Sequence, residues 1–172
     1  MAFQAARPLD PLHWLGLPAL ACLVGAIVFA IPTKILGIVH LPEPVLPLVP
    51  AFAWAVIRPS VLAPLVLLLL GLFLDLLWGT PLGLWSASIL VGYGAIFLSR
   101  NMLTGQSGAV LWIWYGAMTV LAMATGYLLS MLNGGTAPNL LAVLWQFLPT
   151  VLLYPFVHRL VERFEDADVR FR

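Results

Sequence analysis

One acidic residue, Asp75, lies in an apolar run that contains no other charge, GLFLDLLWGTPLG from Gly71 to Gly83. A charged side chain at the centre of a bilayer costs roughly 2.5 to 3.5 kcal/mol on insertion scales, so an acid within a membrane span is a candidate functional residue. Gly79 and Pro81 must end the helix about one turn after the acid. We therefore expect Asp75 near the outer membrane boundary, where it binds nearby loop amides or a local cation and holds the turn together.

The sequence offers little else that could catalyse a reaction. It contains no H-E-x-x-H motif, no G-x-S-x-G motif, no phosphate-binding loop and no pair of carboxylates within the apolar stretches. His13, His40 and His158 are scattered along the chain, and the single Cys22 excludes an intrachain disulfide. We expect a protein that is not an enzyme and that holds no cofactor and no metal.

The composition is that of a polytopic membrane protein. Of the 172 residues, 62% are hydrophobic and 9% are charged, and the mean hydropathy is +1.03. A helix needs about 20 mostly apolar residues to cross a hydrocarbon core of about 30 Å. The stretches that meet this requirement are residues 12–31, 61–78, 81–99, 109–132 and 138–158. We predict an all-α bundle forming one transmembrane domain over residues 1–172, and no binding to nucleic acid because the net charge is only +1.

A further apolar stretch, residues 35–57, has an ambiguous pattern. Glu43 and the prolines at positions 42, 44, 47 and 50 interrupt it, which leaves a continuous uncharged stretch of only about residues 45–57. Broken backbone at membrane depth is tolerated only where other protein or water covers it. We expect a short, irregular second segment, which gives six spans if it crosses the membrane and five if it does not.

The distribution of basic residues predicts the orientation in the membrane. With six spans, one side carries Arg7, Arg58, Arg100, Arg159, Arg163, Arg170 and Arg172, and the other carries only Lys34. The arginine-rich side is cytoplasmic by the positive-inside rule. Five spans give the same seven-to-one ratio with the N-terminus outside rather than in the cytoplasm. Both arrangements place the C-terminus in the cytoplasm and Asp75 on the outer side of a multi-pass membrane protein.

Small residues recur at four-residue spacing in three of the expected spans. These rows are Cys22, Ala26 and Ala30; Ser88 and Gly92; and Ala122, Gly126 and Ser130. Such rows let helix backbones approach closely. They serve either packing within the bundle or contact with the helix of a partner, and the pattern alone does not separate these two roles.

Tryptophans lie close to the expected ends of several spans. Trp54 and Trp112 fall near the inner boundary, and Trp78 and Trp85 fall near the outer one. Indole rings are enriched at membrane–water interfaces. We expect these side chains to anchor the helices there.

The last span carries two prolines and continues as an amphipathic segment. Gln146 with Pro149, and Tyr154 with Pro155, predict kinks at which a side chain bonds a freed backbone carbonyl. Residues 156–172 place apolar and charged side chains on opposite helix faces, which predicts a short cytoplasmic extension. This extension is either an anchor on the membrane surface or a docking site for a cytoplasmic partner.

The pattern from Arg58 to Gly83 resembles one known family. Arg58 is followed by a proline, an apolar run and then G-L-x-x-D-x-L-x-G-x-P-L-G, as in the rod shape-determining protein MreD. The end of the last span, with Leu-Tyr-Pro at residues 153–155 followed by arginines, is similar to the C-terminal end of that family. The resemblance covers residues 58–165.

This resemblance implies a small protein of the bacterial inner membrane that maintains cell shape. MreD-like proteins bind MreC and work with the actin-like MreB, a SEDS glycosyltransferase and a penicillin-binding transpeptidase in lateral peptidoglycan synthesis. The expected function is thus a membrane scaffold of this elongation complex. The candidate partner-binding or structural residues are Asp75, Gly71, Gly79, Pro81, Gly83 and Arg58, together with Gly126 from the row of small residues.

MreD-like chains are also similar to the substrate-binding subunits of energy-coupling-factor transporters, which gives an alternative function. Such a subunit would need a pocket near the outer face lined by several convergent polar groups. Only Asp75, Asn133, Thr136, His40 and Glu43 are available there. A proton- or ion-coupled carrier is a weaker alternative, because a single acid makes a poor relay.

Overall fold

All regular secondary structure in the described residues is helical. The computed structural model describes residues 12–30, 43–57, 60–134 and 139–159. The elements are a π-helical turn η1 (Leu12–Gly16) and the helices α1 (Leu17–Ala30), α2 (Leu48–Ile57), α3 (Leu62–Trp78), α4 (Leu84–Leu103), α5 (Gly108–Gly134) and α6 (Leu140–Leu152). The predicted all-α fold is confirmed, and each helix begins and ends within a few residues of an apolar stretch in the sequence.

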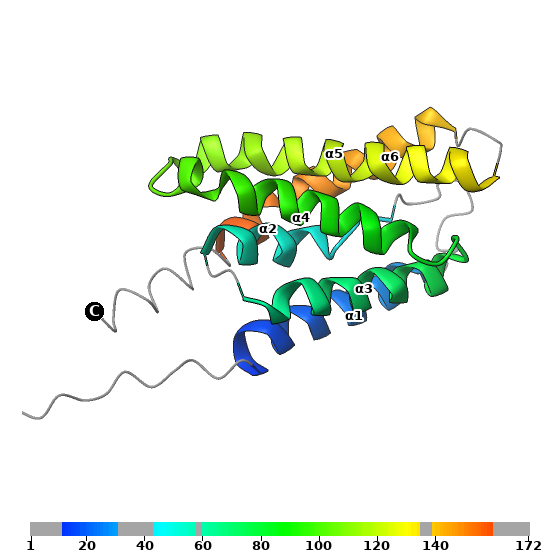
Figure 1. Ribbon diagram of the computed structural model, residues 1–172, viewed down its shortest axis with the longest axis horizontal. Helices are drawn as coiled ribbons and strands as arrows, with labels where there is room; N and C mark the ends of the chain where they lie inside the picture. The colour runs from blue at the N-terminus through cyan, green and yellow to red at the C-terminus, as the bar shows by residue number, and fades with distance from the viewer. Residues whose placement is uncertain (1–11, 31–42, 58–59, 135–138, 160–172) are drawn as a thin grey trace, which may run out of the picture.

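The helices form three stacked pairs, which Figure 1 shows as α1 beside α3, α2 beside α4, and α5 beside α6. Helix α4 lies at the centre of this arrangement and packs against α2, α3 and α5. Helices α1 and α6 lie at the periphery, packed mainly on α3 and α5 respectively. The hydrophobic core therefore follows α2 and the inner faces of α3, α4 and α5.

Helix α2 is buried on all sides. Its side chains from Leu48 to Ala55 are almost fully covered, apart from a partly exposed Val49. At about 1.5 Å per residue, its 10 residues extend over about 15 Å, or half of a hydrocarbon core. Residues 43–47 precede it without forming a helix, because Pro44 and Pro47 supply no backbone N–H. The expected short and irregular second segment is therefore present.

The irregular backbone before α2 obtains its hydrogen bonds from helices far away in the sequence. The Val45 N–H donates to Oγ1 of Thr150 in α6 over 3.1 Å, and the Cys22 thiol of α1 lies 3.5 Å from the Leu46 carbonyl. The hydroxyl of Tyr115 in α5 donates to the Thr150 carbonyl over 3.0 Å. Thr150 thus connects α5, α6 and the entry to α2.

Two of the rows of small residues face each other across α4 and α5. A Cβ atom on Gly92 would lie 3.2 Å from Met118 Cγ, and one on Gly126 would lie 3.0 Å from Ser88 Oγ. Cys22 and Ala26 in the third row are buried within the bundle as well. These residues therefore pack within the bundle.

Helix α6 ends at Leu152, Leu153 forms a turn two residues before Pro155, and a further short helical segment runs to Arg159. The hydroxyl of Tyr154 donates to the Gly108 carbonyl at the start of α5. The prediction for Gln146 is wrong, because its amide makes no hydrogen bond to any residue that the structure describes. The hydroxyl of Thr150 donates to the Gln146 carbonyl instead, over 2.7 Å. Residues 160–172 of the expected extension lie outside the described residues.

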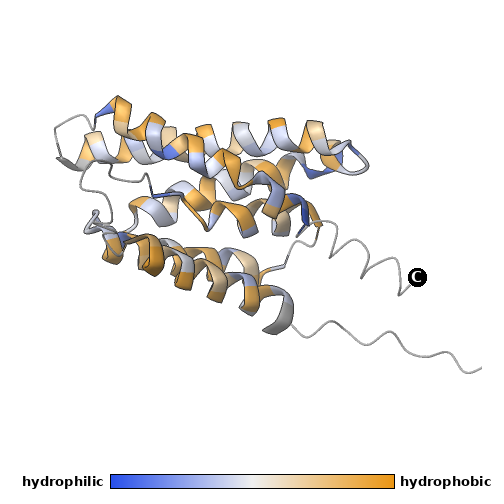
Figure 2. Ribbon diagram, turned by 180° about the vertical axis from the view of Figure 1, so that it is seen from behind, coloured by the Kyte–Doolittle hydropathy of each residue, from blue (hydrophilic) through white to orange (hydrophobic). Residues whose placement is uncertain are grey.

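Apolar side chains cover the outside of the molecule as well as its core. Figure 2 shows hydrophobic residues along the whole length of the helices. Two helices among the described residues are long and apolar enough to cross a membrane, Gly108–Leu132 and Leu140–Arg159. Trp112 is half exposed, but Trp54 and Trp85 are buried in the protein, so the prediction that these two rings anchor the helices at the membrane surface is wrong.

Candidate functional site

The site is built on the turn between α3 and α4. Helix α3 ends because Gly79 adopts a left-handed conformation with φ of 65°, which a residue without a side chain adopts freely. The N–H groups of Gly79 and Thr80 both donate to the backbone carbonyl of Asp75. Gly83 is also left-handed, with φ of 94°, and α4 begins directly after it. These two glycines reverse the chain within four residues.

The carboxylate of Asp75 is the centre of this turn, and only 1% of the residue is exposed. Its Oδ1 atom accepts from the Thr80 hydroxyl over 2.8 Å and from the Trp85 N–H over 3.0 Å. Its Oδ2 atom accepts from the Gly83 N–H over 2.9 Å. The hydrogen bonds from turn amides that we expected are therefore present, and both carboxylate oxygens are occupied.

Asp75 caps helix α4 from the preceding helix. The first N–H groups of a helix have no partner within it, and a short polar side chain at the N-cap position usually accepts from one of them. The N-cap residue of α4 is Gly83, which has no side chain to do so. The carboxylate of Asp75 fills this position, and its charge is favourable next to the positive end of the helix dipole.

Gly71 brings the two helices close enough for this contact. A Cβ atom on Gly71 would lie 2.4 Å from Ser86 Cα and 2.6 Å from Ser86 N, which is too close for any side chain. The hydroxyl of Ser86 also crosses between the helices and donates to the Leu68 carbonyl over 3.1 Å. The backbones of α3 and α4 therefore touch one turn away from Asp75.

The surface of the turn is apolar. Trp78 at the end of α3 and Trp85 at the start of α4 pack edge to face, with their ring centroids 5.1 Å apart. Within the part of the chain that the structure describes, the buried Trp85 Nε1 has no hydrogen-bond partner. Leu82 at the tip is 71% exposed, and Pro81 beside it is exposed as well. The site thus presents an apolar tip on a turn that is fixed from below by a buried acid.

Most of the residues singled out from the sequence meet at this turn. Gly79, Pro81 and Gly83 form the turn, Asp75 holds it, and Gly71 lies one helical turn before Asp75 at the contact between α3 and α4. Gly126 lies nearby on α5, where an added Cβ atom would be 3.6 Å from Leu84 Cδ2 at the start of α4. Arg58, His40 and Thr136, and the side chain of Asn133, lie outside the described residues, as does Lys34. No group of three or more possible metal ligands occurs among the residues described.

Comparison with known proteins adds no relative. No protein-family model matches the chain, and neither curated proteins nor solved structures give a significant match. The case for a function therefore rests on the residues of the chain and on the geometry of the turn.

Sequence reasoning missed three members of the site, Thr80, Trp85 and Ser86. Thr80 follows the left-handed glycine directly, so its hydroxyl was a possible donor to the acid one turn earlier. The partner of Ser86 had no comparable signal, because a serine hydroxyl in an apolar helix usually bonds within its own helix. Ser88 does so here, donating to the Leu84 carbonyl over 2.7 Å.

Proposed function

We propose that the chain is a non-enzymatic scaffold of the bacterial inner membrane that binds an MreC-like protein through the turn between α3 and α4. In this proposal it helps to couple MreB filaments in the cytoplasm to the SEDS glycosyltransferase and the penicillin-binding transpeptidase that build the lateral cell wall. The resemblance of residues 71–83 to MreD supports this function, and so does the way in which those residues fold.

The observation that carries the proposal is the contrast between the buried acid on the inner side of the turn and the exposed apolar residues at its tip. On the inner side, Asp75 is buried, and its carboxylate accepts from two backbone N–H groups and from the Thr80 hydroxyl, all in the turn or at the start of α4. At the tip of the turn, Leu82 and Pro81 are exposed. A carboxylate that served transport would need an oxygen free for an ion or a substrate, whereas an acid that fixes a turn serves to present that turn. A rigid apolar tip suits the binding of another protein, because little conformational freedom is lost on contact.

The proposed arrangement in the membrane has six crossings, with both termini in the cytoplasm and the tip facing the periplasm. The seven-to-one distribution of basic residues supports the cytoplasmic C-terminus and the outward tip, and it is the same for five crossings. The second crossing would consist of α2 and the irregular residues before it. Broken backbone is compatible with this depth because α1 and α6 supply its hydrogen bonds.

Co-purification in a mild detergent tests the function. The variants are Leu82→Ser at the tip and, as a matched control, Leu76→Ser on the outer face of α3, because the two leucines are 71% and 72% exposed. We expect an MreC-like partner to co-purify with the wild-type chain and with the Leu76 variant. Leu82→Ser should lose most of it while the protein accumulates normally, since this side chain is largely exposed.

Three outcomes would contradict the proposal. One is the absence of an MreC-like protein from every preparation. Another is equal recovery with the Leu82 and Leu76 variants, which would place the contact elsewhere. A bound vitamin or an ATPase module in the preparation would instead support the transporter subunit.

A further inference from the structure

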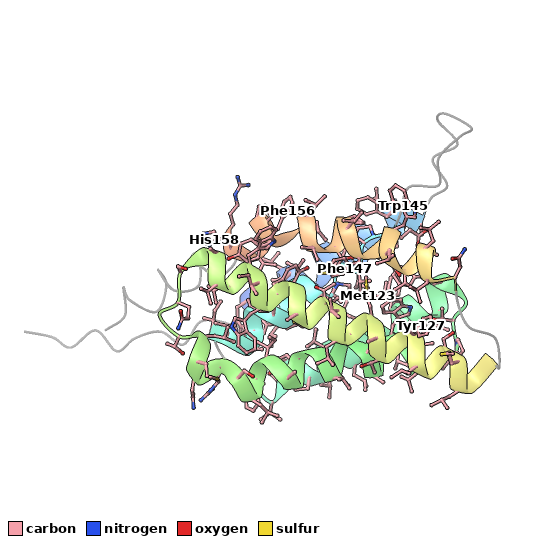
Figure 3. The ribbon with its side chains drawn as sticks, turned by 90° about the horizontal axis from the view of Figure 1, so that it is seen from above. Met123, Tyr127, Trp145, Phe147, Phe156 and His158 are labelled. Carbon is pink, nitrogen blue, oxygen red and sulfur yellow. The ribbon has the colours of Figure 1, made fainter. Side chains whose placement is uncertain are left out.

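Helix α6 is the least covered of the long helices. In an 18-residue segment of the apolar stretch Leu140–Arg159, which contains α6, 11% of the residues are buried inside the protein. In such a segment of the stretch Gly108–Leu132 of α5, 33% are buried. Figure 3 shows Phe147 between α6 and α5, near Met123, while Trp145 and Phe156 lie on the side of α6 that is turned away from α5. A large part of α6 is therefore free to contact the bilayer or another helix.

Gln146 carries an amide side chain in α6 that lipid tails cannot satisfy. Its side chain is partly buried, yet its amide has no hydrogen-bond partner among the described residues. An amide can donate two hydrogen bonds and accept two. Gln146 follows the N-cap residue Asn139 by seven positions, so it lies about 10 Å along the helix axis, well inside a hydrocarbon core of about 30 Å. An unpaired amide at that depth is costly.

The neighbours of Gln146 on one edge of α6 are at least partly exposed. Ala142 is exposed four residues before it, and Pro149 is partly exposed three residues after it, as is Leu153 at the C-cap. Ala142 and Pro149 have compact side chains, which permit a close approach of two helix backbones. No Asp, Glu, Lys or Arg occurs between Leu140 and His158, so charge repulsion does not oppose contact between two such helices.

We propose that two copies of this chain associate through this edge of α6, with their Gln146 amides hydrogen-bonded to each other. An amide is self-complementary, because each can donate to the carbonyl oxygen of the other. A two-fold axis along the membrane normal places identical residues at the same depth, so the second copy supplies the required group without further adjustment. Polar side chains hold transmembrane helices together in this way. The proposal requires α6 to cross the membrane but not that the chain binds an MreC-like protein, so the two proposals can fail separately.

The test measures self-association of the purified full-length chain in lipid vesicles, as the dimer fraction at increasing protein-to-lipid ratios. Gln146→Leu removes the amide but keeps a side chain of similar size. The matched control is Gln106→Leu in the exposed loop between α4 and α5. We expect Gln146→Leu to raise the dissociation constant of the dimer by about fivefold to thirtyfold, as loss of an interhelical hydrogen bond does in model peptides. The control should behave as wild type, and both variants should keep the wild-type helix content.

Cysteine cross-linking locates the interface independently. Ala142→Cys lies on the proposed edge, whereas Val143→Cys lies on the side packed against the core. With the buried Cys22 left in place, mild oxidation should give a dimer for Ala142→Cys and little for Val143→Cys or the wild-type chain. A chain that stays monomeric, a Gln146→Leu variant that dimerises as wild type, or equal cross-linking of the two cysteines would overturn the proposal. A monomeric chain whose Ala142→Cys variant cross-links only to a different protein in native membranes would assign the edge to that protein instead.

Discussion

Replacement of Asp75 should reveal how much of the bundle depends on its carboxylate. The two oxygens accept from two backbone N–H groups and one hydroxyl. An asparagine at this position has one acceptor oxygen and an NH2 group in place of the other. In either orientation of the amide, the N–H of Gly83 or of Trp85 then faces a donor. A leucine leaves both N–H groups without an acceptor.

The expected losses follow from the number of unpaired groups. A buried donor left without a partner costs about 1 to 3 kcal/mol. Asp75→Asn should therefore lower the free energy of unfolding by about 1 to 3 kcal/mol, and Asp75→Leu by about 2 to 6 kcal/mol. The measurement is a titration of the purified protein from mild detergent into SDS, followed by circular dichroism. Glu43→Gln is the matched control, because Glu43 is partly exposed and bonds no described residue, and its stability should equal that of wild type.

The same variants should affect partner binding in the same order if the turn presents the contact surface. Equal stability of the wild-type protein and Asp75→Leu would refute the reasoning, since it would mean that water or lipid satisfies the amides as well as the acid does. An Asp75→Asn variant as stable as wild type would refute the claim that both carboxylate oxygens are needed.

Three further predictions concern other parts of the fold. Gly71→Ala should destabilise the protein by about 1 to 3 kcal/mol in the same titration, because its Cβ atom would lie 2.4 Å from the Ser86 backbone; a neutral effect would disprove the close approach of α3 and α4. Thr150→Val should lower the thermal midpoint, whereas Thr150→Ser should not, because only valine leaves the irregular backbone before α2 without its acceptor; equal midpoints would exclude this role. A cysteine at Gly134 should react with an impermeant maleimide in spheroplasts and one at Arg172 should not, and the reverse pattern would overturn the orientation.

Much of the helix layout could be predicted from the sequence, because apolar length and glycine or proline positions determine where a helix can continue. The contacts of Asp75 were also accessible. An acid one turn before a glycine and a proline has the amides of the next turn within reach, whichever way the rest of the chain folds.

The surroundings of the tryptophans could not be predicted in the same way. The sequence places Trp54 four residues before Arg58, near the expected inner boundary, yet its ring lies in the core and donates to the Trp14 carbonyl over 3.2 Å. In a membrane protein, lipid and protein interior are equally apolar, so hydropathy does not distinguish a helix that faces lipid from one that other helices surround. Helix α2 is of the second kind.

The bond between Val45 and Thr150 also has a consequence for how the protein is made. It joins positions 105 residues apart, so when the second segment leaves the ribosome, the side chain that will accept its N–H has not yet been synthesised. If the chain crosses the membrane as proposed, the amide of this segment needs another partner, such as water, until α6 arrives. The second segment would then reach its final hydrogen bonding only after the last helix has entered. A truncated chain that ends before α6 should be recognised as unfinished and degraded.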